Sequence, residues 1–284
     1  MFKRKWMLGS VAMAAALVLG ACSGDDSSES LGDINLAYVE WDTEVASTHV
    51  VGHVLEEMGY DVTLTPLDNA IMWEAVSKGE ADAMVAGWLP ATHAAQLDKY
   101  GADLEDLGAN LDGAKIGLVV PSYMDVNSIE DLSDEAKKTI TGIEPGAGIM
   151  AASENALEKY SNLDGWTLQA ASSGAMTVAL EQAIKNNEEI IVTGWSPHWK
   201  FASHDLKYLE DPKGIYGGAE SIHTFARKGL ADEHAEAYKV LDAFNWTVED
   251  MEEVMLDIQA GTSPKDAAEK WVEANSELVE GWKK

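Results

Sequence analysis

The chain has 284 residues, a single cysteine and a formal net charge of −29. A surface this acidic repels a phosphate backbone, so we expect no nucleic-acid partner and interpret the charge as a solvated face that keeps the protein soluble. One cysteine cannot form a disulfide within the chain, so a body of about 250 residues must be held by one large core or two smaller ones.

The N-terminus has the pattern of a secretory signal. A cationic start, Met1–Lys5, precedes an apolar segment, Met7–Leu19, which is shorter than the roughly 20 residues of a membrane span. Cys22 follows at the position where bacterial lipoproteins carry their lipidated residue. We therefore predict a signal peptide over residues 1–21, a lipid anchor on Cys22 and a flexible tether over 22–32. The alternative is an ordinary cleaved signal in which Cys22 is incidental.

Apolar runs and helical patterns alternate through the first part of the body. Gly59 and Gly79 stand where helices typically stop. The predicted elements are a strand over 34–39, a helix that ends before Gly59, a strand over 61–65, a helix over 70–78 and a strand over 83–86. This β-α-β-α-β order predicts a mostly parallel sheet with helices on both faces.

The same order restarts after an apolar strand over 115–121. The second series consists of a strand over 139–143, a turn over 146–148, a helix over 149–160, a strand over 167–170, a helix over 175–185 and a strand over 190–193. We therefore predict two α/β lobes that face each other across a cleft. Lobe 1 comprises residues 33–120 and 223–284, and lobe 2 comprises 121–222. Helices over 231–244, over 248–259 and from Pro264 onward are expected to pack on lobe 1.

The pattern Gly-Trp-x-Pro occurs twice, once in each predicted lobe. The copies are Gly87–Pro90 and Gly194–Pro197, and each follows a predicted strand. In open α/β sheets ligands bind beyond the carboxyl ends of the strands. Trp88 and Trp195 are therefore predicted to meet a small molecule, and Trp41, which follows the first strand, is a third candidate. A lone tryptophan at a strand end is more often a packing residue, but three at equivalent positions favour a site.

Signs of catalysis or of a metal site are weak. His49 and His53 stand four residues apart, a possible metal-ligand spacing, but no third ligand is evident, so we predict no metal. The strongest indication of an enzyme is Gly146–Ala151, which matches a loose Gly-x-Gly-x-x-Ala dinucleotide pattern. The next predicted strand ends without the acidic residue that this pattern requires. We therefore predict neither an enzyme nor a cofactor, and keep a dinucleotide enzyme as the alternative.

The same turn has a simpler use as an anion site. The amides of Gly148 and Ile149 open a predicted helix, where unpaired N–H groups and the helix dipole favour a carboxylate. His93, five residues after Trp88, can add a side-chain donor. A tight turn that binds nothing is the alternative reading. Aromatic faces select a quaternary ammonium group, which has no N–H to donate. The three tryptophans and the amides of Gly148 and Ile149 together predict a binding site for a zwitterion.

These residues resemble a known family. Val120–Met124, Gly142–Met150 and Thr193–Trp199 are similar to segments of the glycine betaine-binding proteins of ABC importers, the OpuAC type. The resemblance covers nearly the whole body, from about Ile34 to Trp282. It implies a two-lobed periplasmic-binding-protein-like fold of type II with the ligand in the cleft.

The resemblance also assigns roles to the candidate residues. It implies an aromatic prism formed by Trp41, Trp88 and Trp195, with the carboxylate held by His93 and by the amides of Gly148 and Ile149. His198 and Trp199 are expected to support the site without touching the ligand. The implied protein is lipid-anchored and extracytoplasmic, captures glycine betaine or an analogue, and delivers it to the transmembrane subunits of an importer for osmoprotection. A ligand sensor of the same fold is the alternative.

Overall fold

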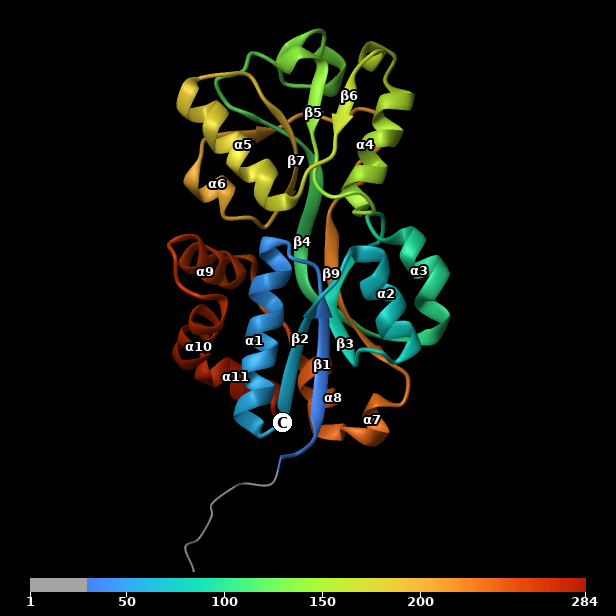
Figure 1. Ribbon diagram of the computed structural model, residues 1–284, viewed down its shortest axis with the longest axis vertical. Coiled ribbons are helices and arrows are strands. Elements are labelled where there is room, and N and C mark those ends of the chain that lie inside the picture. Colours follow the sequence, from blue (N-terminus) through green and yellow to red (C-terminus); the bar gives the residue numbers. More distant parts are fainter. Residues whose placement is uncertain (1–29) are drawn as a thin grey trace, which may run out of the picture.

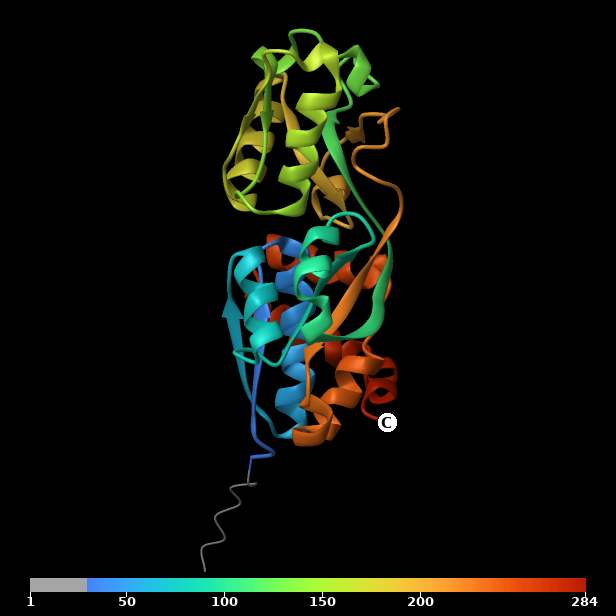
Figure 2. The same cartoon turned by 90° about the vertical axis from the view of Figure 1, so that its right-hand side faces the viewer.

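The computed structural model of the protein describes residues 30–284 and forms two lobes stacked along its long axis (Figure 1). Strand β4 (Leu104–Pro121) runs from one lobe into the other, and β9 (Glu220–Arg227) lies beside its first part. Figure 2 shows that both connecting strands lie along one edge of the molecule. The predicted signal peptide, Cys22 and most of the tether lie outside the described residues.

The first lobe is built on a mixed sheet. Its parallel strands are ordered β2 (Asp61–Pro66), β1 (Asp33–Tyr38) and β3 (Ala83–Leu89), and β9 then pairs antiparallel with both β3 and β4. Helices α1 (Asp42–Met58), α2 (Asn69–Lys78) and α3 (Ala94–Tyr100) follow the first three strands. The predicted helix stops are confirmed, since Gly59 and Gly79 cap α1 and α2 with φ of 102° and 72°.

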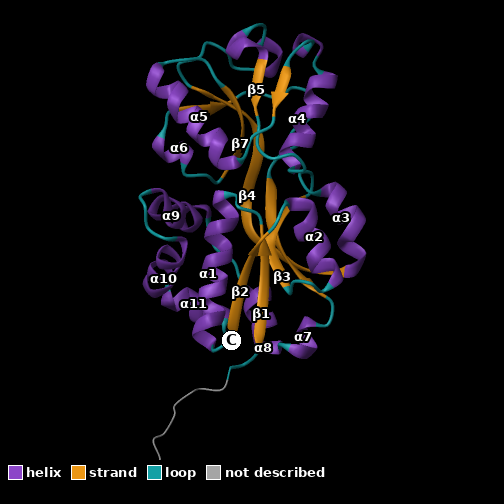
Figure 3. Cartoon of the chain, viewed as in Figure 1, coloured by secondary structure: helices purple, strands orange, loops and turns teal. Residues whose placement is uncertain are grey.

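The second lobe repeats this arrangement on a smaller scale. Strand β5 (Thr139–Thr141) lies parallel to β6 (Thr167–Gln169) and β7 (Ile191–Ser196), and the last part of β4 pairs antiparallel with β7 and β8 (Leu206–Tyr208). Helices α4 (Gly148–Lys159), α5 (Ser173–Asn186) and the short α6 (Lys200–Ser203) surround the strands, as the colouring of Figure 3 shows.

Five helices close the chain. They are α7 (Leu230–Glu233), α8 (Ala235–Ala243), α9 (Val248–Gln259), α10 (Pro264–Ala274) and α11 (Ser276–Trp282). Helices α8, α9 and α10 contact α1, so this part packs on the first lobe. An aromatic cluster of Phe244, Trp246, Trp271 and Trp282 fills its interior. These tryptophans are buried, as expected for packing residues.

The first part of β4, strand β8 and strand β9 were not predicted from the sequence. Strand β4 begins at Leu104, eleven residues before the predicted start, and β8 and β9 were not expected. The early part of β4 contains Gly108 and Gly113 at positive φ and three register shifts against β9, which interrupt the alternation of apolar and polar residues. The predicted helix over 231–244 is two helices, because the chain leaves helical geometry at His234.

The strand pairing changes within β4. Ala114 pairs with Glu220 of β9, and the next residue, Lys115, pairs with Ser196 of β7. The lobe boundaries at residues 120 and 223 remain predictions. Among residues 30–284, no helix is both long and apolar enough to cross a membrane.

Candidate functional site

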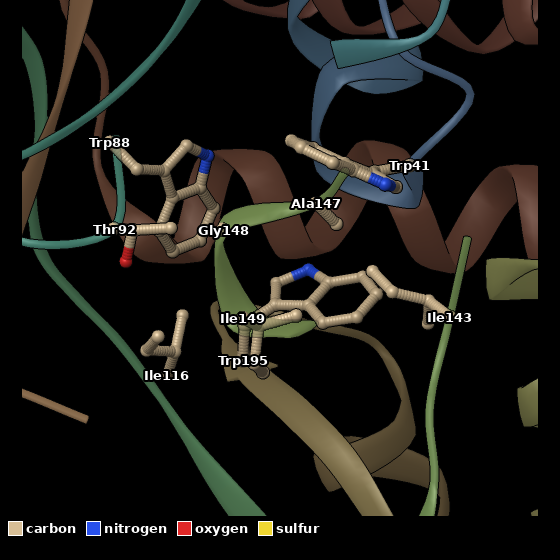
Figure 4. Close-up of a pocket in the computed structure, with 9 residues that line it drawn as sticks. All are labelled: Trp41, Trp88, Thr92, Ile116, Ile143, Ala147, Gly148, Ile149 and Trp195. Carbon is tan, nitrogen blue, oxygen red and sulfur yellow. The ribbon is translucent and has the colours of Figure 1, made fainter. Parts of the chain in front are cut away.

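A pocket lies where the two lobes meet (Figure 4). It encloses about 290 Å³, including its opening to solvent. Its lining is largely apolar and comes from Trp41, Trp88, Thr92, Ile116, Ile143, Ala147, Gly148, Ile149 and Trp195. The structure therefore brings together five of the six residues predicted to bind a ligand.

The two tryptophans of the first lobe are held by carboxylates. Trp41 precedes the first turn of α1 and donates its indole N–H to Glu144 of the second lobe. Trp88 lies near the end of β3, within the strand and not beyond it as predicted, and donates its indole N–H to Glu44 at 2.7 Å. Both rings are buried, so each hydrogen bond fixes the plane of one wall of the pocket.

Trp195 has different neighbours. It lies within β7, and no acceptor among residues 30–284 takes its buried indole N–H. The ammonium of Lys200 lies 4.1 Å from the ring centroid, and the ring of His198 meets it edge-on at 4.9 Å. Because Lys200 does not line the pocket and Trp195 does, the indole separates the ammonium from the cavity.

The start of α4 forms the polar end of the pocket. Gly146 has a φ of 94°, a conformation that favours glycine. Gly148 is required for a different reason, since a Cβ there would lie 2.2 Å from the backbone oxygen of Thr92 in the first lobe. Among the described residues no acceptor bonds to the amides of Gly148 or Ile149, which open the helix beside the cavity.

Thr92 is held in place by Glu220 at the start of β9. One carboxylate oxygen of Glu220 accepts from the amides of Ala91 and Thr92 at 2.7 and 2.8 Å, and the other accepts from the hydroxyl of Thr92. The turn after the first Gly-Trp-x-Pro copy is thereby pressed against α4 of the opposite lobe.

His93 lies beside this pocket, not in its lining. It is fully buried, and its ring stacks on Trp41 with 5.9 Å between centroids. Its Nδ1 accepts from the amide of Trp88 at 3.0 Å, which assigns the proton to Nε2. Burial lowers the pKa of His93 to about 3, so the ring is neutral. Nε2 has no partner among residues 30–284, and the role predicted for His93 remains a prediction.

Asp42 joins the two lobes next to the pocket. Its oxygens accept from the indole of Trp199 at 2.7 Å and from the hydroxyl of Ser173 at 3.4 Å, and His198 Nε2 lies 3.3 Å away. Burial alone would raise the pKa of Asp42, but His198, Trp199 and Lys200 outweigh it and lower the pKa to about 2. His198 and Trp199 therefore lie behind Trp195 and connect it to the first lobe.

The structure also shows the surroundings of the possible metal ligands and of the dinucleotide-like turn. His49 bonds through Nδ1 to the carbonyl of Val45, 2.7 Å away on its own helix, and residues 30–284 contain no cluster of three or more potential metal ligands. The Gly146–Ala151 turn opens onto the small pocket between the lobes.

Sequence reasoning missed several residues of the site. Thr92, Ile116, Ile143 and Ala147 line the pocket, and Glu44, Glu144 and Asp42 stand behind it. For Ala147 the neighbouring glycines were a usable signal. Nothing in the one-dimensional pattern singled out the carboxylates, because their indole partners are 44 to 157 residues away in sequence.

A family model shows where this chain belongs. Residues 32–274 match the substrate-binding domain of the ABC-type glycine betaine transport system. The chain is a member of this family. Its family is one of transport binding proteins, which act outside the cytoplasm, and not one of enzymes.

Solved structures and a curated relative agree with this assignment. Lactococcal OpuAC, in a closed conformation complexed with glycine betaine, is 57% identical with a TM-score of 0.87, over 89% of this chain and all of that one. The glycine betaine, L-proline-binding protein ProX from Borrelia burgdorferi is 35% identical with a TM-score of 0.86, over 89% and 97% of the two chains. The glycine betaine/carnitine transport binding protein GbuC from Listeria monocytogenes is 51% identical over 54% of this chain and 51% of GbuC. This match therefore spans about half the length of GbuC.

The predicted two-lobed α/β fold and the family resemblance are thereby confirmed.

Proposed function

We propose that the protein captures glycine betaine, or a closely related quaternary ammonium zwitterion, between its lobes. The observation that carries this proposal is the meeting of three tryptophans from both lobes with the N-terminus of α4 in one pocket. The rings offer aromatic faces to a cation, and the helix start offers amides to an anion. A zwitterion with both groups fits this arrangement.

In this proposal the ligand bridges the lobes. Its trimethylammonium group lies among Trp41, Trp88 and Trp195, and its carboxylate accepts from the amides of Gly148 and Ile149. The unpartnered Nε2 of His93 supplies a further donor. Because Trp41, Trp88 and His93 belong to one lobe and Trp195, Gly148 and Ile149 to the other, the ligand binds the closed form better than an open one and shifts the population toward closure.

Membership of the family supports the biological role that we propose. The protein acts outside the cytoplasm as a lipoprotein anchored through Cys22 and hands its ligand to the transmembrane subunits of an ABC importer, in support of osmoprotection. It catalyses no reaction and needs no cofactor or metal. A dinucleotide is much larger than glycine betaine, so the small pocket at Gly146–Ala151 argues against the enzyme alternative.

Isothermal calorimetry on the purified body tests the ligand. Glycine betaine is expected to bind, and NAD is expected to give no heat. Choline lacks a carboxylate and would leave the amides of Gly148 and Ile149 unpaired, so it should bind more weakly. Binding of NAD without binding of glycine betaine would overturn the proposal.

The anchor requires a separate test in cells. Replacement Cys22→Ala should release the protein from the membrane fraction. Retention of the variant in that fraction would contradict lipidation of Cys22 without affecting the ligand assignment.

A further inference from the structure

Glu44 is a buried carboxyl group behind one wall of the pocket. Its residue is 1% exposed, one oxygen accepts from the indole of Trp88 at 2.7 Å, and the other accepts from the hydroxyl of Thr43. Within residues 30–284, no lysine, arginine or histidine forms an ion pair with it. Buried charges are usually paired, so Glu44 lacks the partner that its burial calls for.

The position of Glu44 favours a negative charge only in part. It is the third residue of α1, where the helix dipole and free amides stabilise an anion. Burial nevertheless raises its pKa to about 7, against hydrogen bonds from Thr43 and Trp88 that favour the ionised form. A positive charge in the neighbouring pocket would favour the ionised form of Glu44, because it attracts the carboxylate.

Glu144 provides a comparison within the same site. It also accepts an indole N–H, that of Trp41, but it is only half-buried and lines the wider opening of the cleft. Glu144 also accepts from the amide of Ser173 at 3.3 Å and joins the two lobes through Trp41. Solvent screens a charge at this opening, whereas the charge of Glu44 acts through protein.

We propose that Glu44 is the buried counter-charge that makes the cage select a cationic group, acting through its hydrogen bond to Trp88. This assignment rests on the proposed function, because it supplies the missing partner of Glu44 from the ligand. Glu44 touches Trp88 and does not line the pocket, so it is a positioning and specificity-determining residue.

The carboxylate of Glu44 favours a cationic ligand in two ways. A carboxylate that accepts the indole N–H polarises the ring, which makes its face more attractive to a cation. The carboxylate also attracts the ligand's charge directly across the ring. The opposite wall differs, since the amino group of Lys200 lies over Trp195, and burial lowers the pKa of Lys200 although Asp42 acts in the opposite direction. Glu44 is thus the unneutralised charge at the first-lobe side of the cage.

A pair of ligands isolates the charge from the shape. In 3,3-dimethylbutanoate a carbon atom replaces the nitrogen of glycine betaine, so size and carboxylate are retained and the positive charge is lost. Calorimetry at pH 8.5, where Glu44 is largely ionised, would compare both ligands for wild type and Glu44→Gln. The glutamine keeps an oxygen for the indole of Trp88.

We expect Glu44→Gln to weaken glycine betaine binding by about tenfold or more and to leave the neutral ligand within about twofold. Glu44→Met, which carries no polar group, should also weaken glycine betaine binding while leaving binding of the neutral ligand nearly unchanged. This second variant tests the same assignment if the amide of Glu44→Gln perturbs folding. The matched control Glu144→Gln should weaken both ligands by a similar factor, because it loosens a contact between the lobes.

Equal weakening of both ligands by the Glu44 variants, or no weakening of either, would overturn this assignment. These outcomes leave the proposed function intact as long as the wild type binds glycine betaine. Absence of glycine betaine binding by the wild type would instead refute the proposed function itself.

Discussion

The two Gly-Trp-x-Pro copies have the same local geometry and opposite surroundings. Each ends a buried strand, and in each the peptide bond before proline is cis. Behind Trp88 lies the carboxyl of Glu44, whereas over Trp195 lies the ammonium of Lys200. The histidines that follow differ as well, since Nδ1 of His93 accepts from the amide of Trp88 and Nδ1 of His198 accepts from that of Lys200.

This difference shows how a repeated motif acquires two roles. The backbone of the motif places a tryptophan at the cleft in both lobes, but the residues behind the ring determine its electrostatic character. In the proposed function, the first copy attracts the cation and the second copy completes the cage. The second copy also connects, through His198, Trp199 and Asp42, to the opposite lobe.

Replacement of Trp88 or Trp195 should cause the largest loss of ligand affinity, and the loss should be greater for Trp88. Trp88→Ala should cost about 2 kcal/mol or more of glycine betaine binding, and Trp195→Ala about half as much, because a carboxylate accepts the indole N–H of Trp88 and none of the described residues accepts that of Trp195. Calorimetry on both variants measures this, with Trp166→Ala, a buried tryptophan outside the pocket, as the control. Equal losses, or a larger loss for Trp195→Ala, would show that the residues behind the rings do not matter.

The contact between Thr92 and Gly148 tests how the first copy meets the second lobe. Gly148→Ala should weaken ligand binding by about 1–3 kcal/mol, since its Cβ would collide with the carbonyl of Thr92 when the lobes close. Gly174→Ala is the matched control, because it lies at the start of α5 with open space around it. If Gly148→Ala bound the ligand as well as Gly174→Ala does, closure would not depend on this contact.

The buried ammonium of Lys200 should affect stability. Burial lowers its pKa to about 7 from 10.5, although Asp42 acts in the opposite direction. Between these values the unfolded state holds the proton and the folded state does not, so stability rises with pH from about 7 upward. Lys200→Met should lack this rise and should be about 1 kcal/mol more stable at pH 7, because the buried amino group of Lys200 has no hydrogen-bond partner among the described residues.

Urea unfolding at several pH values, with the exposed-site variant Lys239→Met as control, measures both quantities. A Lys200→Met variant less stable than wild type would indicate that Lys200 is needed as the partner of Asp42.

The smallest expected effect concerns selectivity at the second copy. At pH 6, where Lys200 is protonated, Lys200→Met should increase the preference for glycine betaine over 3,3-dimethylbutanoate by about threefold, because it removes a positive charge that opposes only the cationic ligand. Competition binding with the two ligands measures the ratio. An unchanged ratio would mean that Trp195 and Asp42 shield the pocket from Lys200.

Much of the fold followed from local pattern. The β-α-β-α-β order, the glycine stops at Gly59 and Gly79 and the helix over 248–259 were visible because apolar spacing and caps are local properties. The first part of β4 and β9 were not visible, because their pairing joins residues more than a hundred positions apart and is irregular at Gly108 and Gly113. Cross-strand partners at such separations leave no periodic signal in a single sequence.

The sequence by itself determined the element order, the family resemblance and the residue types of the proposed cage, since strand ends and a glycine-rich helix start are local features. Only the tertiary structure decided what stands behind each ring. Glu44 and Lys200 contact Trp88 and Trp195 through the folding of helix α1 and of the segment after β7, and Thr92 meets Gly148 only because the lobes come together. Charge and close packing at the site depend on distance in space, which no spacing along the chain reports.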